Sequence, residues 1–548
     1  MDRELRKDLE RIRRFEQEND DKLRKKKCKS PEICAGDEKQ RVRFSLPRAK
    51  EFHPTEDEFK DPLSYISKIQ SEASKYGVVK IIPPCTWKPM FAPCFGVFEN
   101  SDRLFCVRRQ TVQKKTVLPL NDSWGVAFEF KVEHMSKHFT LDKFEEEASG
   151  RRNVFADESK DANRIFWEHV CRTNSCAFLY GSDLTGTACS EDAGKWNLEK
   201  FSNDSLLGMI RSSGDPDICG VNLPMLYVGH AFSMFGWHIE DNALYSLNYM
   251  HKGSAKTWYG VPGHEAQKLE KLAKSLFEQK DDLSCRLYQK LSMISPNLLL
   301  DAGIPVYELV QRPGEFVITM PRSYHSGFSH GFNVGEAVNF ALPEWIPYGF
   351  SSLESHRGIG RESVLNLEKF LFNDSSFFNV SVYSAQALVT LIRWQQAVIK
   401  VAEERGVKIQ RITRSSRGSP EQSDRVDKRV MCCYCKHSMY LMYLYVPGGD
   451  GIRFCPDHAN HMEVEVECLS LYIRFTKEEL ANMEELCQAV LSDPTQHKDL
   501  VGFQGEILVH FDMAQPIISD KPKKSSKTQS TLFEFPSSPF YNMQTSQS

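Results

Sequence analysis

Two residues with metal-ligand chemistry lie close together in residues 236–241, where one residue separates His238 from Glu240. In an extended strand the side chains alternate between two faces, so this imidazole and this carboxylate point to the same side. They supply two of the three ligands of the 2-His-1-carboxylate triad, which binds ferrous iron and leaves positions open for substrate and oxygen. A His-x-Glu pair at a strand end also occurs as an ordinary hydrogen-bonded pair, so the two residues alone leave both interpretations open.

A third ligand is available later in the chain. His325 follows residues 315–319, a β-branched and aromatic segment that predicts a strand. Strands distant in sequence lie side by side in a jelly roll, which would allow His325 to approach His238 and Glu240. The sequence therefore contains the residues for a candidate iron site.

The elements that must position these ligands are short strands. A helical interruption at 265–290 separates the early strands from the late ones. Many short strands with turn signals between them favour a sandwich or jelly-roll barrel. The predicted strands are residues 221–227, 232–240, 244–250, 257–261, 306–310, 315–320 and 337–342.

The flanking regions have different periodicities. Pro62 follows a possible N-cap, Asp61, and predicts the start of a helix that ends at Gly77, before a strand at 78–82. Residues 100–150 predict short strands and polar turns, with a short helix at 141–148. An amphipathic helix is expected at 381–405, and Thr476 with Glu479 forms a capping-box pattern.

Composition limits the class of protein. The 548 residues suggest about three domains, and 41% hydrophobic with 26% charged residues is typical of a soluble globular protein. The net charge of -3 gives no overall basic excess for nucleic-acid binding. No apolar run is long enough to span a membrane, and the charged N-terminus does not resemble a secretory signal. The 16 scattered cysteines then favour a reducing compartment.

A second metal-binding pattern lies near the C-terminus. Cys432-x-x-Cys435 is followed, after 19 intervening residues, by Cys455-x-x-His458. Two close ligand pairs that bracket a hairpin can close a tetrahedral zinc site, whereas buried free thiols are the alternative. Four protein ligands leave no open position, so the predicted zinc ion is structural.

Taken together, these segments resemble a known family. Residues 52–92 resemble a JmjN module, and residues 163–345 resemble the JmjC domain of the Jumonji histone lysine demethylases. The sequence motifs are most similar to those of the branch that acts on histone H3 lysine 4. The motifs that carry this resemblance are residues 61–66 (DPLSYI), 226–229 (LYVG), 238–241 (HIED), 256–262 (KTWYGVP), 314–317 (GEFV), 324–328 (YHSGF) and 336–340 (EAVNF).

The resemblance implies a role for each matching residue. The implied iron ligands are His238, Glu240 and His325. The implied 2-oxoglutarate site consists of a cation and a phenol on the distal carboxylate, an aromatic ring that packs on the co-substrate, and two polar groups nearer the metal: Lys256, Tyr180, Phe235, Ser246 and Asn248. The implied wall of the methyl-lysine pocket is Tyr227, because an aromatic face attracts a methylated ammonium.

The resemblance also implies the activity. An Fe(II)- and 2-oxoglutarate-dependent dioxygenase of this family demethylates lysine on histone H3, here expected at lysine 4, and releases formaldehyde and succinate. A nuclear location and chromatin or co-repressor partners are expected, with no membrane and no dedicated DNA-binding domain. A hydroxylase acting on a non-histone protein and a non-catalytic chromatin-binding scaffold are the alternatives. The family's zinc finger has more cysteines, but only Cys433, His461 and Cys468 are left over here, so one zinc ion is predicted.

The expected fold class is mainly β with α (α+β), with a double-stranded β-helix (a cupin-like jelly roll) as the JmjC core. The expected divisions are 1–50 (charged, partly disordered), 51–92 (JmjN), 93–162 (connecting segment), 163–350 (JmjC), 351–410 (helical), 411–428 (linker), 429–500 (zinc finger and C-terminal helix) and 501–548 (largely disordered tail).

Overall fold

The computed structural model describes residues 46–95, 104–120, 124–149, 162–172, 177–212, 215–277, 287, 289–372, 381–412, 429–447, 451–461 and 464–492. The predicted charged N-terminal segment up to residue 45, the linker at 413–428 and the predicted tail lie outside these residues. No helix among the described residues combines the length and the apolar composition needed to cross a membrane.

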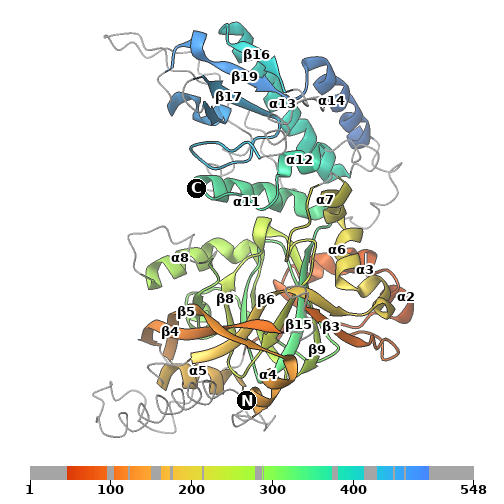
Figure 1. Ribbon diagram of the computed structural model, residues 1–548, viewed down its shortest axis with the longest axis vertical. Helices are drawn as coiled ribbons and strands as arrows, with labels where there is room; N and C mark the ends of the chain where they lie inside the picture. The colour runs from red at the N-terminus through yellow and green to blue at the C-terminus, as the bar shows by residue number, and fades with distance from the viewer. Residues whose placement is uncertain are drawn as a thin grey trace.

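A large mixed sheet forms one wall of the barrel (Figure 1). Its order is β1 (Glu51–Phe52), β2 (Val78–Ile81), β13 (Phe316–Thr319), β9 (Tyr245–Gly253), β15 (Asn333–Phe340), β7 (Met225–Gly229), β6 (Ala177–Cys189), β4 (Phe105–Pro119), β5 (Trp124–Phe139) and β11 (Ser292–Ile294), with β3 (Phe91–Phe95) paired to β6.

A smaller antiparallel sheet forms the second wall. Every residue of β10 and β14 is buried, as expected for strands covered on both faces. Side chains from both sheets line one cavity between them. The predicted fold class, with a double-stranded β-helix as its core, is therefore confirmed. The order of this sheet is β12 (Tyr307–Gln311), β10 (Lys256–Val261), β14 (Tyr324–Ser329) and β8 (Met234–His238).

The N-terminal elements pack against the large sheet. Thr55 and Glu58 form a capping box at the start of the first helix, and Phe59 stacks on Trp196 with ring centroids 4.4 Å apart. Gly77 adopts φ +78°, and a Cβ there would lie 2.6 Å from a carbonyl oxygen of β10. This close approach requires glycine. The α-helices that precede β12 in the described part of the chain are α2 (Glu56–Phe59), α3 (Pro62–Ala73), α4 (Leu141–Ser149), α5 (Ala162–Arg172), α6 (Leu198–Asp204), α7 (Met209–Ser212), α8 (Ala266–Leu276) and α10 (Pro296–Asp301).

The C-terminal unit has its own sheet, which Figure 1 shows at the opposite end of the molecule from the barrel. Two helices pack together beside it, and Arg393 of one donates to Glu484 of the other at 2.7 Å. The sheet order is β16 (Lys408–Arg411), β19 (Ser470–Ile473), β17 (Met442–Val446) and β18 (Ile452–Phe454), and the helices from the barrel onward are α11 (Ile346–Gly358), α12 (Leu367–Leu371), α13 (Val382–Glu404) and α14 (Lys477–Ser492).

Most predicted elements are present with shifted ends. The strand at 78–82, the helices at 141–148 and 381–405, and the Thr476–Glu479 capping box are confirmed. Helix α3 ends at Ala73, before Gly77, and the Asp61 carboxylate accepts a hydrogen bond from the Ser64 hydroxyl instead of capping the helix.

The prediction of short strands within 100–150 was wrong. β4 and β5 form one long hairpin whose strands have 15 and 16 residues. Strands β6 and β14 were not predicted. Pairing partners far along the chain stabilise these strands, and a local pattern does not contain that information.

Candidate active site

The candidate iron ligands converge where β8 and β14 lie side by side. His238 and His325 are direct partners across this antiparallel pair, with ring centroids 4.2 Å apart. Strand β8 ends at His238, and Glu240 follows in an extended conformation (φ −67°, ψ 154°). A Glu240 oxygen lies 3.2 Å from His325 Nε2. The His238 and Glu240 side chains therefore point to the same side, as predicted from the sequence, although Glu240 lies just beyond the strand.

Backbone carbonyls fix the orientation of both imidazoles. His238 Nδ1 lies 2.7 Å from the carbonyl oxygen of Gly236, and His325 Nδ1 lies 3.1 Å from that of Ser323. When each Nδ1–H donates to its carbonyl, each Nε2 lone pair is free to bind a metal ion, as in most metal-bound histidines. Two Nε2 atoms and one carboxylate then face a common point.

The local charges favour the protonation states that metal binding requires. Burial, and then the neighbouring charge of His325, hold the pKa of His238 well below its ordinary value, so this imidazole is neutral. Burial acts to raise the pKa of Glu240, but Lys290 and His325 outweigh it and the net pKa lies well below the usual range. Neutral imidazole and ionised carboxylate are the forms that ligate iron, so the donor set fits ferrous iron.

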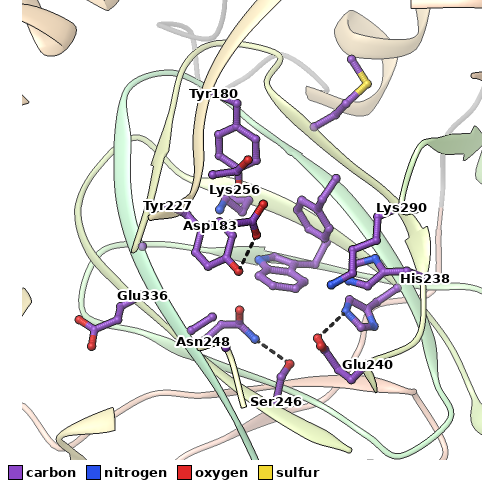
Figure 2. A pocket seen from close by; sticks show the side chains of 18 of the residues that line it. Tyr180, Asp183, Tyr227, His238, Glu240, Ser246, Asn248, Lys256, Lys290 and Glu336 are labelled. Carbon is purple, nitrogen blue, oxygen red and sulfur yellow. Dashed lines mark hydrogen bonds and ion pairs between the residues drawn. The ribbon is translucent and has the colours of Figure 1, made fainter. Parts of the chain in front are cut away.

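A cavity of about 190 Å³ lies beside this triad (Figure 2). Every residue predicted for the co-substrate site and for the methyl-lysine pocket lines this cavity. Strand β9 contributes two of these residues: Asn248 donates to the Ser246 hydroxyl at 3.0 Å, and that hydroxyl lies 2.6 Å from the hydroxyl of Thr319. Because Ser246 and Asn248 are two positions apart, they point to the same side of their strand.

Lys256, which is buried on β10, is one of the basic residues that line the cavity. Its ammonium lies 5.9 Å from the ring centre of Tyr180 and 5.8 Å from that of Phe235. Burial lowers the pKa of Lys256 to about 8. Burial also raises the pKa of the Tyr180 phenol above its ordinary value, so this phenol remains a hydrogen-bond donor. One cation and one phenol at the same end suit a carboxylate.

Tyr227, which is predicted to form a wall of the methyl-lysine pocket, lines the same cavity. Its hydroxyl donates to the carboxylate of Asp183 at 3.3 Å, and its ring centre is 6.2 Å from that of Tyr180. Asp183 also pairs with Arg108. The Tyr227 hydroxyl is thereby held by a carboxylate that is itself paired with a guanidinium.

Several residues that line the cavity were not predicted from the sequence, among them Asp183, Trp258 and Lys290. Asp183 has φ +56°, which a sequence pattern does not indicate. Trp258 donates to Gln311 Oε1 at 3.0 Å, and its ring centre lies 6.0 Å from the Lys256 ammonium. Only the chain's tertiary arrangement places the three side chains at this cavity.

Comparison with known proteins identifies the two modules of this region. Residues 225–340, which hold all three candidate iron ligands, match the family described as "JmjC domain, hydroxylase", and residues 50–83 match the jmjN domain. The chain therefore contains a JmjC domain and a jmjN domain. The matched JmjC segment runs from β7 to β15 and lies inside the predicted 163–350, and the jmjN match runs from just before β1 to the end of β2.

Proteins similar to this chain are known from plants and from an animal. The chain is 32% identical over 497 residues to Lysine-specific demethylase JMJ706 of Oryza sativa subsp. japonica, covering 82% of this chain and 54% of the relative. It is 31% identical to Lysine-specific demethylase JMJ703 of the same organism (75% and 38% covered) and 38% identical to Lysine-specific demethylase 5B of Gallus gallus (53% and 19% covered). The chain thus spans about half the length, or less, of these curated relatives.

The Cys/His pattern of the C-terminal unit also comes together in space. Cys455 Sγ lies 3.0 Å from His458 Nδ1 and 3.9 Å from Cys435 Sγ, and Cys432 Sγ lies 3.8 Å from the same His458 nitrogen. These separations are close to those of ligand atoms around a tetrahedral zinc ion, roughly 3.3–3.8 Å, so the four residues fit zinc. Cys433 and Cys468 are exposed, and within the described residues neither joins a metal-binding group.

Arg357, at the end of α11, connects this unit to the barrel. Its guanidinium is buried, pairs with Asp457 and donates to Cys455 Sγ at 3.4 Å. A guanidinium at a cysteine sulfur stabilises the thiolate that would bind zinc. Helix α11 follows the last barrel strand, β15, almost directly, so Arg357 joins the candidate zinc site to the JmjC domain.

Replacing Arg357 by methionine is expected to destabilise the C-terminal unit by about 3–5 kcal/mol, because the buried Asp457 carboxylate would lose the guanidinium that pairs with it. Hydrogen exchange of the amides in 429–461 measures this loss. Lys477→Ala is the matched control, since the Lys477–Glu403 pair is half exposed and should contribute about 1 kcal/mol or less. Equal effects of the two substitutions would contradict the assignment.

Proposed function

We propose that this chain is an Fe(II)- and 2-oxoglutarate-dependent dioxygenase that demethylates lysine on the histone H3 tail, with lysine 4 as the expected position. The observation that carries the proposal is the convergence of His238 Nε2, His325 Nε2 and the Glu240 carboxylate beside a cavity that contains Lys256 and Tyr180. The relatives are named lysine-specific demethylases, and these names support the substrate class.

In this proposal each group of residues has one task. His238, Glu240 and His325 would hold ferrous iron, and Lys256 with Tyr180 would bind the distal carboxylate of 2-oxoglutarate. When bound, iron and 2-oxoglutarate would supply, with dioxygen as the oxidant, the oxidation of an N-methyl group, and the products would be succinate, carbon dioxide, formaldehyde and the demethylated lysine. The protein's own contribution is to bind and orient the reactants and to keep water out.

The remaining cavity residues position the reactants. Phe235 packs beside the Lys256 cation and would cover the co-substrate, while Ser246 and Asn248 face the metal side of the pocket. The Tyr227 ring would form one wall of the methyl-lysine pocket, where its face attracts a methylated ammonium. Its phenol stays protonated because burial and the charge of Asp183 raise its pKa.

The wider assignments follow from the same proposal. Cys432, Cys435, Cys455 and His458 would hold one structural zinc ion. The protein would act in the nucleus on chromatin, with chromatin or co-repressor complexes as partners. The domain divisions given above, with JmjN at 51–92 and JmjC at 163–350, remain predictions.

A peptide assay tests the proposed reaction. Purified protein is incubated with iron, ascorbate, 2-oxoglutarate and a panel of methylated histone peptides, and the products are weighed by mass spectrometry. Loss of one CH₂ unit per methyl group, together with formaldehyde release, is the expected result. Gain of one oxygen atom would instead indicate a hydroxylase, and an unchanged peptide that still binds would indicate a scaffold. The panel also tests lysine 4 against other positions.

The pH dependence of 2-oxoglutarate binding tests the role of Lys256. Burial lowers the pKa of its ammonium to about 8, so the empty site loses this charge as the pH rises through that value. The co-substrate carboxylate binds the charged form. The Kd should therefore be lowest below about pH 8 and rise by about tenfold per pH unit above it.

Calorimetric titration with 2-oxoglutarate from about pH 7 to about pH 9.5 measures this profile. Lys256→Arg is the matched control, because a guanidinium keeps its charge over this range. The variant should bind more weakly and with a flat profile. A wild-type profile as flat as that of the variant would contradict the role of Lys256.

A further inference from the structure

A third compact group of metal-ligand side chains lies outside both sites described above. In the part of the chain that the structure describes, three such groups have ligand atoms within 4.8 Å of one another: the candidate iron triad, the Cys/His group of the C-terminal unit, and Cys189, His251 and Glu336. The last group combines a thiol, an imidazole and a carboxylate and has no part in the proposed reaction.

The three side chains come from β6, β9 and β15. His251 Nε2 lies 2.8 Å from Glu336 Oε2 and 4.0 Å from Cys189 Sγ. Around a tetrahedral zinc ion, ligand atoms lie roughly 3.3–3.6 Å apart, given Zn–N of about 2.0 Å and Zn–S of about 2.3 Å. The two observed separations lie on either side of this range. Shifts of a few tenths of an ångström would therefore admit an ion.

Glu336 lies on a strand that lines the cavity of the iron site, but the ligand atoms of this group lie on the opposite face of the sheet. On β9, Ser246 and Asn248 point into the cavity, so Tyr249 points to the other face. His251 lies at a register shift of this strand, and its contact with Glu336 places its side chain on the same face as Tyr249. Glu336 is the cross-strand partner of Tyr249, and Figure 2 shows its carboxylate directed away from the labelled iron ligands. This separation makes the group a distinct site.

The surrounding residues already hold the ligands in place. Glu336 is almost completely buried, and its carboxylate accepts hydrogen bonds from the Thr187 hydroxyl at 2.7 Å and from the Ala188 amide at 2.8 Å. The Tyr249 ring lies edge-on to the imidazole of His251, with centroids 4.8 Å apart. Hydrogen bonds such as those that the Glu336 carboxylate accepts orient the ligating carboxylates of metal sites.

We propose that Cys189, His251 and Glu336 bind a zinc ion, through one thiolate, one imidazole nitrogen and one carboxylate oxygen, with water as the fourth ligand. A thiolate and an imidazole favour zinc over the hard cations magnesium and calcium. Zinc takes the place of the thiol proton, which leaves to solvent. The ion ties the end of β6 to the two central strands β9 and β15, so its role is structural.

Zinc content tests the proposal. Wild type and Cys189→Ser are stripped with a chelator, reloaded with zinc, freed of excess metal and analysed by elemental mass spectrometry. We expect Cys189→Ser to retain about one zinc equivalent fewer per chain. The difference does not depend on whether zinc also enters the iron triad, because both proteins carry that triad. Equal zinc content in the two folded proteins would overturn the proposal.

Cys171→Ser is the matched control, because Cys171 is also a buried thiol but lies on α5, outside the group. It should retain the wild-type zinc content. A second measurement needs no variant: zinc should slow the alkylation of Cys189 in wild-type protein and leave that of Cys171 unchanged. If Cys189→Ser fails to fold, this measurement decides, and equal alkylation rates with and without zinc would reject the site. Neither readout requires demethylase activity.

Discussion

Replacing His238 by alanine is expected to lower kcat/KM for the proposed demethylation by at least about 10³-fold, because it removes one of the three proposed iron ligands. His238 is buried and directly paired with His325, so no neighbouring group replaces its Nε2 atom. Iron content and formaldehyde release, measured on the same preparations, should fall together. The expected loss in rate corresponds to about 4 kcal/mol of transition-state stabilisation.

His264→Ala is the matched control for this experiment. The His264 side chain is 69% exposed and lies beyond β10, away from the candidate iron site. The variant should keep its iron and its rate. Unchanged demethylation by His238→Ala, with the protein folded, would show that the iron site is wrongly assigned even if the chain is a demethylase.

Replacing Cys455 by serine is expected to remove about one zinc equivalent and to unfold the region 429–461. Cys455 Sγ is the central atom of its group, since it contacts both Cys435 and His458. Structural zinc contributes about 10–16 kcal/mol of apparent binding free energy in isolated zinc-finger peptides, more than this small sheet can replace by packing. Elemental analysis and hydrogen exchange measure the two effects.

Cys433→Ser provides the comparison, because Cys433 is adjacent to Cys432 in sequence but exposed. It should keep both the zinc and the amide protection of the unit. If Cys455→Ser retained full protection in 429–461, the four residues would be buried thiols and an imidazole without a structural ion. Since the candidate iron site lies in the barrel, demethylation in vitro should be affected less than by His238→Ala.

Local patterns were sufficient where a short stretch of chain decides the outcome. The capping box at Thr476, the long helix α13 and the buried strand β10 depend on residues within a few positions, and the structure has all three. The predicted ends of elements were less accurate. Helix α3, for example, was expected to end at Gly77 but ends at Ala73. End positions depend on what the chain packs against as well as on the terminal residue.

The sequence by itself determined which residues could do chemistry: the spacing of His238 and Glu240 places both on one side of an extended chain, and the Cys-x-x-Cys and Cys-x-x-His pairs fix a zinc pattern. Only the tertiary structure decided which of them meet. Antiparallel pairing of β14 with β8 brings His325 to His238, and the order of the large sheet brings Cys189 to Glu336. Such contacts depend on strand pairing across long stretches of chain, which no local periodicity encodes.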